Sequence, residues 1–161
     1  MDINEAREIV MDKAREPGGT VCLCCSKHVQ VYHRKFNSRM ASILMAIFRE
    51  FEAHPGKYLE VGNYCAKKKG MIAGEHGKLV LWGLLEKKPG DENNRGAKTH
   101  GLYRMTQRGF DFVYNRISIP SHVYEYNNVA ESFEGEIRIA ESLGESFNYP
   151  ELMNQDCRKA G

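Results

Sequence analysis

The residues with the clearest capacity for chemistry are two cysteines near the start of the chain. Cys22 and Cys25 have the C-x-x-C spacing of half a zinc ribbon, and a predicted strand follows them. Tetrahedral zinc takes four ligands, and no second C-x-x-C is present, so scattered residues must complete the site. We therefore predict a candidate zinc site at Cys22 and Cys25 with His28 or His33. Further candidate ligands are Cys65, His100, or the Cys22 and Cys25 of a second copy.

The alternative for these two cysteines is a pair of reduced thiols packed under the core, or a redox-sensitive pair. The chain has five cysteines, an odd number, and no export signal, so a disulfide framework is not expected. Cys24 is interpreted as a bystander and Cys65 as a small core residue. Cys157 is expected to be exposed and free.

No enzyme signature occurs in the sequence. Gly77-Lys78 lacks the upstream glycine of a phosphate loop, and G-x-G-x-x-G, G-x-S-x-G and H-E-x-x-H are absent. Glu86-Lys87-Lys88 has the E-x-K form of metal-dependent nucleases, but no aspartate lies on a strand just upstream. We interpret Glu86 and Lys88 as the last turn of a helix, where the positive charge of lysine interacts favourably with the helix dipole. We therefore expect no enzyme.

Charge is distributed unevenly along a chain whose net charge is only +2. Residues 17–120 hold 17 Lys and Arg against 8 Asp and Glu, a net charge of +9, whereas residues 121–161 hold 3 against 8, a net charge of −5. The basic part suits an anionic partner, and the acidic part suits a protein partner or screens the basic face. Two ordinary solvated faces are the alternative.

A chain of 161 residues suits one domain that needs neither metal nor disulfide to fold. The longest strongly apolar run, "ASILMAIF", is far shorter than the roughly 20 residues of a membrane span. The start lacks the basic and apolar regions of a signal peptide. We expect a cytoplasmic protein that does not contact a membrane.

Hydrophobic spacing predicts four helices in the first part of the chain. An amphipathic helix over 2–16 ends at "PGG", and a half-exposed strand carries Val29 and Val31. A core helix over 38–53, capped by Asn37 or Ser38, is followed by a short helix that breaks at Gly70. A longer helix over 74–88 would place Leu79, Trp82 and Leu85 on one face.

In the second part of the chain, the sequence predicts strands on either side of a short helix. "THGLYRM" and "RISIP" are predicted strands on either side of a helix capped by Thr106. Arg104 and Arg108 are expected to point outward. A hairpin turning at Asn127-Asn128 follows Pro120, with "EIRIAESL" and "YPELMN" after it.

From residue 38 the predicted order is helix, short helix, longer helix, loop and strand, which is typical of a winged helix-turn-helix domain. The sequence resembles the winged-helix regulator group, in particular small proteins of the MarR and PadR kind and the winged-helix proteins common in phages and prophages. "LLEKK" would end the third helix, and "GLYRMTQRGFDFV" is similar to the strand, Leu-Thr-x-x-Gly, apolar run of those wings. The resemblance covers roughly residues 38–120. It implies that the third helix lies in the major groove and that the wing touches the flanking backbone.

DNA binding needs cations that neutralise phosphates and polar side chains that reach base edges. The lysine run at 67–69 lies where the turn before the third helix would approach the backbone, although a solvated turn is the alternative. Base reading is poorly supported, because the predicted third helix offers few polar groups and contains Gly77 and Gly83, each costing about 1 kcal/mol of helix propensity. The predicted DNA contacts are Lys67, Lys68, Lys69, His76, Lys78, Arg95, Lys98, Arg104 and Arg108.

The sequence therefore predicts an α+β protein with a winged helix-turn-helix core. Residues 1–19 form an N-terminal helix, 20–37 a Cys knuckle and strand, 38–120 the winged-helix domain and 121–161 an acidic, β-rich extension. We expect a non-enzymatic, homodimeric DNA-binding regulator of phage or prophage type. The alternative is a module that binds a host protein through the apolar third helix or the acidic residues from Glu125 to Glu151.

Overall fold

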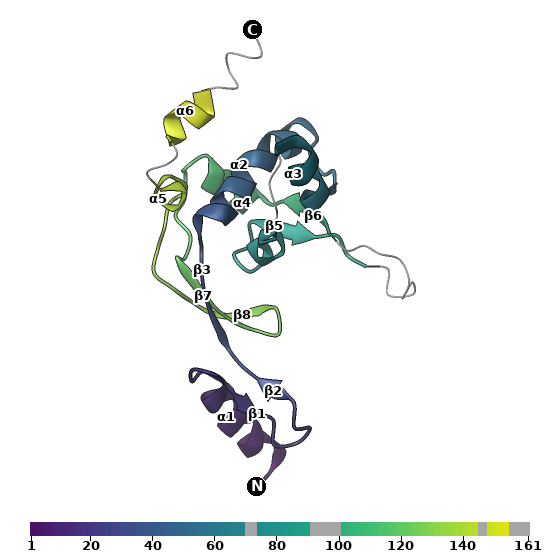
Figure 1. Ribbon diagram of the computed structural model, residues 1–161, viewed down its shortest axis with the longest axis vertical. Helices are drawn as coiled ribbons and strands as arrows, with labels where there is room; N and C mark the ends of the chain where they lie inside the picture. Colours follow the sequence, from purple (N-terminus) through teal and green to yellow (C-terminus); the bar gives the residue numbers. More distant parts are fainter. Residues whose placement is uncertain (70–73, 91–100, 145–147, 155–161) are drawn as a thin grey trace.

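The computed structural model describes residues 1–69, 74–90, 101–144 and 148–154, and it is a mixed α+β protein. In Figure 1 a small unit at the N-terminal end is followed by a three-stranded sheet and then by a helical body. Within the described ranges, no helix combines the length and apolar character needed to cross a membrane.

The N-terminal unit is the predicted amphipathic helix packed on a short hairpin. Helix α1 (Ile3–Ala14) begins at Asp2, whose side chain accepts from the Glu5 backbone N–H while the Glu5 side chain accepts from that of Asp2. Its buried residues Ala6, Val10 and Ala14 face strands β1 (Thr20–Val21) and β2 (His28–Val29). The helix is thus amphipathic as predicted, with one apolar face covered.

A three-stranded antiparallel sheet has the order β3-β7-β8. It joins the N-terminal part of the chain, which supplies β3, to the C-terminal part, which supplies β7 and β8. Strand β3 (Tyr32–Lys35) pairs with β7 (His122–Tyr126), and β7 pairs with β8 (Val129–Glu134). Asn127 and Asn128 have φ angles of 52° and 63°, the left-handed conformation that a two-residue hairpin turn requires. The predicted hairpin is confirmed.

Helix α2 (Ser38–Ala53) is the centre of the main core, as predicted. Its cap is Asn37, whose side-chain oxygen accepts from the Met40 N–H at 3.0 Å. Helices α4 (Gln107–Val113) and α5 (Ile139–Leu143) pack against it. Its buried residues are Met40, Ala41, Ile43, Leu44, Ile47, Phe48 and Phe51.

A second small sheet has the order β4-β6-β5. Strand β4 (Leu59–Glu60) leads directly into α3 (Val61–Lys69), the predicted short helix. Strand β6 (Leu102–Met105) is the predicted strand of "GLYRM", and β5 (Leu85–Lys87) pairs with it antiparallel.

The prediction of a long third helix over 74–88 is wrong. Only η1 (His76–Val80) is helical, as a 3-10 helix, and the chain then turns through Gly83 into β5. Gly83 has a φ of 70°, which a helix excludes and glycine accepts readily. Leu79, Trp82 and Leu85 are all buried, so their helical spacing correctly identified core residues in the wrong element.

Long-range contacts hold this segment in place. The Trp82 ring lies edge-on to Phe36, with ring centroids 5.5 Å apart, and its indole N–H donates to the Pro120 carbonyl at 2.7 Å. Phe36 also contacts Phe112 edge-on at 5.4 Å. Residues from three parts of the chain therefore determine the path of the η1 segment.

The C-terminal residues hold more helix than the predicted β-rich extension. The hairpin is followed by α5 and by α6 (Tyr149–Asn154). The predicted strand "RISIP" forms only an isolated bridge between Ile119 and Ile137. Ile139 and Leu143 lie in the main core beside α2, so this part of the chain is integral to the fold.

We predict that Gly109→Ala destabilises the protein by about 1–3 kcal/mol, the usual cost of overpacking a core. Thr106 caps α4 here by accepting from the Gly109 N–H at 3.1 Å. A Cβ on Gly109 would clash with the Leu84 carbonyl oxygen and lie 2.7 Å from Met105 Cγ. Urea unfolding measures the loss. The control is Gly74→Ala, which meets open space, and equal stability of the two variants would contradict the prediction.

Candidate functional site

Exposed lysines lie on α3 and at the end of β5. Lys67 and Lys68 are exposed on the last turns of α3, and Lys87 and Lys88 are exposed at the end of β5. Among the described residues none of the four forms an ion pair. The side chain of Lys69, predicted to bind DNA with Lys67 and Lys68, lies outside the described part. These lysines are therefore available to an external anion.

On the outer face of the small sheet, an aromatic ring lies beside Lys88 and Arg104. The Arg104 guanidinium lies 5.0 Å and the Lys88 ammonium 5.8 Å from the centroid of the Tyr58 ring. Arg104 also bonds the carboxylate of Glu86, its cross-strand partner, and this hydrogen bond raises the pKa of Arg104. Glu86 is thus on a strand, and its interpretation as a helix end is wrong.

The remaining predicted DNA contacts have partners within the protein. Lys78 lies 3.2 Å from Oε1 of Glu75, and the His76 ring stands edge-on to Tyr103 at 5.3 Å. Arg108, expected to point outward, donates from Nε to the Trp82 carbonyl at 3.0 Å. Because residues 76–80 form only a 3-10 turn, His76 and Lys78 are not presented by a recognition helix, and Arg108 lies on α4. Arg95 and Lys98 lie outside the described residues.

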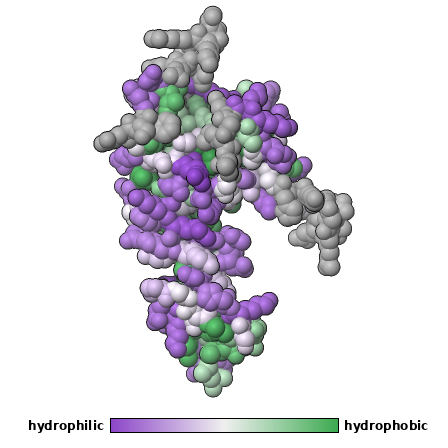
Figure 2. Space-filling view, viewed as in Figure 1, coloured by the Kyte–Doolittle hydropathy of each residue, from purple (hydrophilic) through white to green (hydrophobic). Residues whose placement is uncertain are grey.

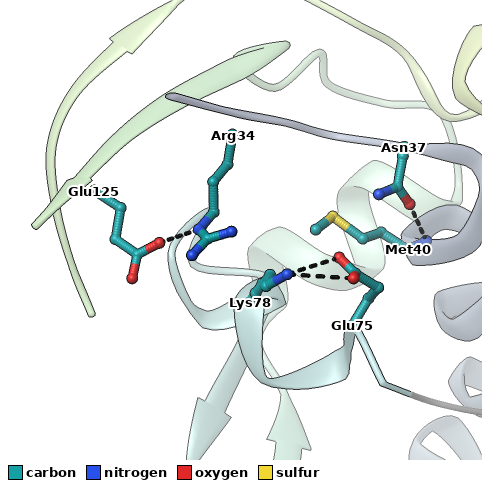
Figure 3. A network of polar contacts seen from close by, with 6 residues as sticks. All are labelled: Arg34, Asn37, Met40, Glu75, Lys78 and Glu125. Atoms are coloured by element: carbon teal, nitrogen blue, oxygen red, sulfur yellow. Dashed lines mark hydrogen bonds and ion pairs between the residues drawn. The ribbon is translucent and has the colours of Figure 1, made fainter. Parts of the chain in front are cut away.

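Figure 3 shows the polar contacts where β3 and β7 approach η1. The Glu125 carboxylate is buried, with 5% of the residue exposed, and it bonds the Arg34 guanidinium. Lys78 contacts both carboxylate oxygens of Glu75 on the opposite side. Arg34 and Lys78 therefore each have an acidic partner, whereas Lys35 and Lys87, which line the adjoining pockets, form no ion pair among the described residues.

The cysteine residues form a tight knuckle between β1 and β2. The Cys22 N–H donates to the Lys27 carbonyl at 2.8 Å, and Ser26 returns a bond to the Cys22 carbonyl at 3.0 Å. Cys22, Cys24 and Cys25 are free thiols. Hydrogen bonds from the backbone of Cys24 and Cys25 lower the pKa of Cys22. The knuckle therefore favours the thiolate form of Cys22.

The two histidines proposed to complete the zinc site lie on different strands: His28 is on β2, opposite Val21 and so close to Cys22 along the hairpin, and His33 is on β3. His28 is exposed and lies 3.3 Å from the Gln30 side chain, whereas His33 lies on β3 beside His122 and Glu134. Among the described residues, no group of three or more metal-ligand side chains includes Cys22 or Cys25. Cys65 is fully buried in the main core, as expected.

A cluster that the sequence did not predict lies on the central sheet. His33 of β3, His122 of β7 and Glu134 of β8 each offer a ligand atom, and these atoms lie within 4.8 Å of one another. Tyr124 stacks on His33 at 4.5 Å, and its hydroxyl lies 3.3 Å from Oε2 of Glu134. Desolvation and the Glu134 carboxylate raise the pKa of Tyr124. The only signal in the sequence was the alternation within each strand, which says nothing about which strands pair.

No protein-family model, curated protein or solved structure matches this chain.

We predict that iodoacetamide alkylates Cys22 at a lower pH than Cys24 or Cys25. The thiolate is the reacting species, and the backbone N–H groups of the knuckle stabilise it at Cys22. Rates measured from pH 6 to 9 by tandem mass spectrometry, which resolves the three positions, would show the Cys22 rate rising first. Identical pH profiles for the three thiols would contradict this prediction.

Proposed function

We propose that this protein is a non-enzymatic DNA-binding protein that holds the phosphate backbone with α3 and with the β5–β6 strand pair. The observation that carries the proposal is the set of exposed lysines on α3 and β5, which have no acidic partner among the described residues. Phosphate neutralisation by such cations supplies most of the affinity of non-specific DNA binding. The members of the set are Lys67, Lys68, Lys87 and Lys88.

The arrangement of the elements supports the same proposal. Helices α2 and α3 come before β6, which is the strand where the winged-helix resemblance expects a wing to begin, and the partner of β6 is β5, at the residues where that resemblance expects the third helix to end. Tyr58, Arg104 and Lys88 give this sheet an outer face with both cationic and aromatic groups, which can meet phosphate and sugar. We therefore keep the winged-helix interpretation as part of the proposal.

Within residues 121–144 and 148–154, no glutamate of the acidic C-terminal part pairs with the lysines of α3 and β5. Two of its glutamates meet N-terminal cations instead: Arg34 bonds Glu125, and Arg15 lies 3.5 Å from Glu131. His33 lies 3.0 Å from Glu134. The basic surface of α3 and β5 is thus free to meet DNA, which favours binding over self-screening.

Residues 74–88 contain no α-helix, and this limits how far the protein can read a DNA sequence. A recognition helix is the usual means of reading base edges in the major groove. Here His76 contacts Tyr103 and Lys78 contacts Glu75, so neither is offered freely to a base. We infer binding that tolerates many sequences, as in a regulator of phage or prophage type that relies on backbone contacts.

We predict that Lys67→Ala with Lys68→Ala weakens binding to a mixed-sequence duplex similarly for every sequence tested. Each lost phosphate contact lowers the slope of log K against log salt by about 1, so the double variant should lose about 2. Fluorescence anisotropy from about 50 to 200 mM salt measures both quantities.

The matched control is Lys13→Ala with Lys27→Ala, which removes two exposed lysines from the N-terminal unit. This variant has the same net charge as the test variant, so it separates local contacts from a general loss of charge. The proposal expects its salt slope to stay near that of the wild type. Equal slopes for the two double variants would remove α3 from the DNA surface.

A second candidate function is protein binding, and a specific observation favours it. Figure 2 shows hydrophobic surface gathered over the N-terminal unit, where Ile3 and Leu23 are 75% and 59% exposed. Both residues line a pocket with Val10, Met11 and Val29. The surfaces expected earlier are less suitable, because the apolar side chains at 79–85 are mostly buried and Glu125 is paired. A second copy is the occupant we propose, since one apolar patch can meet itself across a two-fold axis.

We predict that Leu23→Glu shifts the protein from dimer to monomer, because a carboxylate would be buried in the apolar interface. Sedimentation equilibrium at micromolar concentrations measures the shift, which we expect to be at least tenfold in the dimer dissociation constant. Phe133→Glu, at an exposed apolar residue of β8 that does not line this pocket, should leave the dimer intact. A monomeric wild type would exclude this interface.

A further inference from the structure

Three adjacent strands bring two imidazoles and a carboxylate together on one face of the central sheet. His122 is the cross-strand partner of Glu134, and His33 is the partner of Tyr124, two residues further along β7. The His33 and His122 rings are stacked with centroids 4.8 Å apart, and His33 Nε2 lies 3.0 Å from Oε2 of Glu134. Lys35, the partner of His122, is on the same face.

Ser121 determines which nitrogen of His122 carries the proton. The Ser121 hydroxyl lies 3.1 Å from the Glu134 backbone carbonyl, which can only accept, so the hydroxyl proton is used there. Ser121 Oγ also lies 2.8 Å from His122 Nδ1, and it must therefore accept a proton from that nitrogen. The neutral His122 ring then has its lone pair on Nε2, the state of a histidine ready to bind a metal.

The contact between His33 and Glu134 marks a position that a cation can take. A carboxylate accepts only, so in the contact between these two residues Nε2 of His33 supplies the proton. Tyr124 donates to the same carboxylate oxygen and orients it. A metal ion that displaces the His33 proton would bond the same nitrogen and oxygen, because metals bind neutral imidazole and ionised carboxylate.

We propose that His33, His122 and Glu134 form a binding site for a divalent transition-metal ion, with Zn²⁺ as the best fit. Two histidines and one carboxylate are a common zinc ligand set, and imidazole selects transition metals over Mg²⁺ and Ca²⁺. Three protein ligands leave a fourth position for water. The site differs from the cysteine site predicted from the sequence and does not depend on DNA binding.

Metal binding would require the side chains of the site to rotate. A metal lies in the plane of each imidazole that binds it, so the stacked His33 and His122 rings must turn until their nitrogens converge. The side chains of His33 and Glu134 are 46% and 56% exposed, so they can turn without disturbing the core. Bound metal would tie β3 to β7 and β8 and so connect the two ends of the chain.

The test is isothermal titration calorimetry of the full-length, metal-free protein with ZnCl2. We expect His122→Gln and His33→Gln each to weaken zinc binding at this site at least tenfold. Cys22→Ser with Cys25→Ser should leave that binding unchanged. Circular dichroism of each variant checks the fold, and long-range ¹H–¹⁵N spectra of the wild type should show the ring nitrogens of both histidines shifting on zinc addition.

Two results would overturn the proposal. One is a wild type that binds no zinc in the calorimeter. The other is zinc binding that disappears in the Cys22→Ser, Cys25→Ser variant and persists in both histidine variants, since the thiols would then hold the metal. Unshifted histidine nitrogens in zinc-saturated wild type would lead to the same conclusion.

Discussion

Pairing of β7 with β3 and β8 is the constraint on which the rest of the structure depends. Strand β3 belongs to the N-terminal part of the chain and β7 to the C-terminal part, and the ladder continues into a bond from the Phe36 N–H to the Ser121 carbonyl at 2.8 Å. This bond holds the backbone of Phe36, whose ring contacts Trp82 and Phe112 in the main core. The same sheet reaches the N-terminal unit, because Tyr124 and Tyr126 pack beside Val29 and Val31. Both cores thus rest on one sheet.

This pairing also decides how charge is distributed over the molecule. It brings Glu125 and Glu131 to Arg34 and Arg15 of the N-terminal part, places Glu134 beside His33, and buries Glu125 against Arg34. A buried ion pair of this kind adds little net stability, but removing one partner costs about 3–5 kcal/mol because the other charge is left uncompensated. The lysines of α3 and β5 keep no such partner among the described residues. The proposed DNA binding uses these lysines, which are exposed and unpaired within the described residues.

Local signals predicted local structure well. The amphipathic face of α1, the Asn37 cap of α2, the Thr106 cap of α4 and the Asn127-Asn128 turn depend on residues a few positions apart, and all are confirmed. The segment at 74–88 was predicted wrongly, because contacts of Trp82 with Phe36 and Pro120 override its helical spacing. The histidine cluster could not be predicted either, because it depends on which strands pair. His33 and Glu134 are 101 positions apart in the chain, and only the strand register brings them together with His122.

The measurement that tests the central claim most directly is the salt dependence of wild-type binding to duplexes of unrelated sequence. Lysines on α3 and β5 that hold phosphates predict an affinity that falls steeply and linearly in log K against log salt, with similar slopes for all duplexes. Without a recognition helix, the affinities for different sequences should also differ little. No detectable binding at about 50 mM salt would contradict the account and leave the apolar N-terminal surface as the functional one.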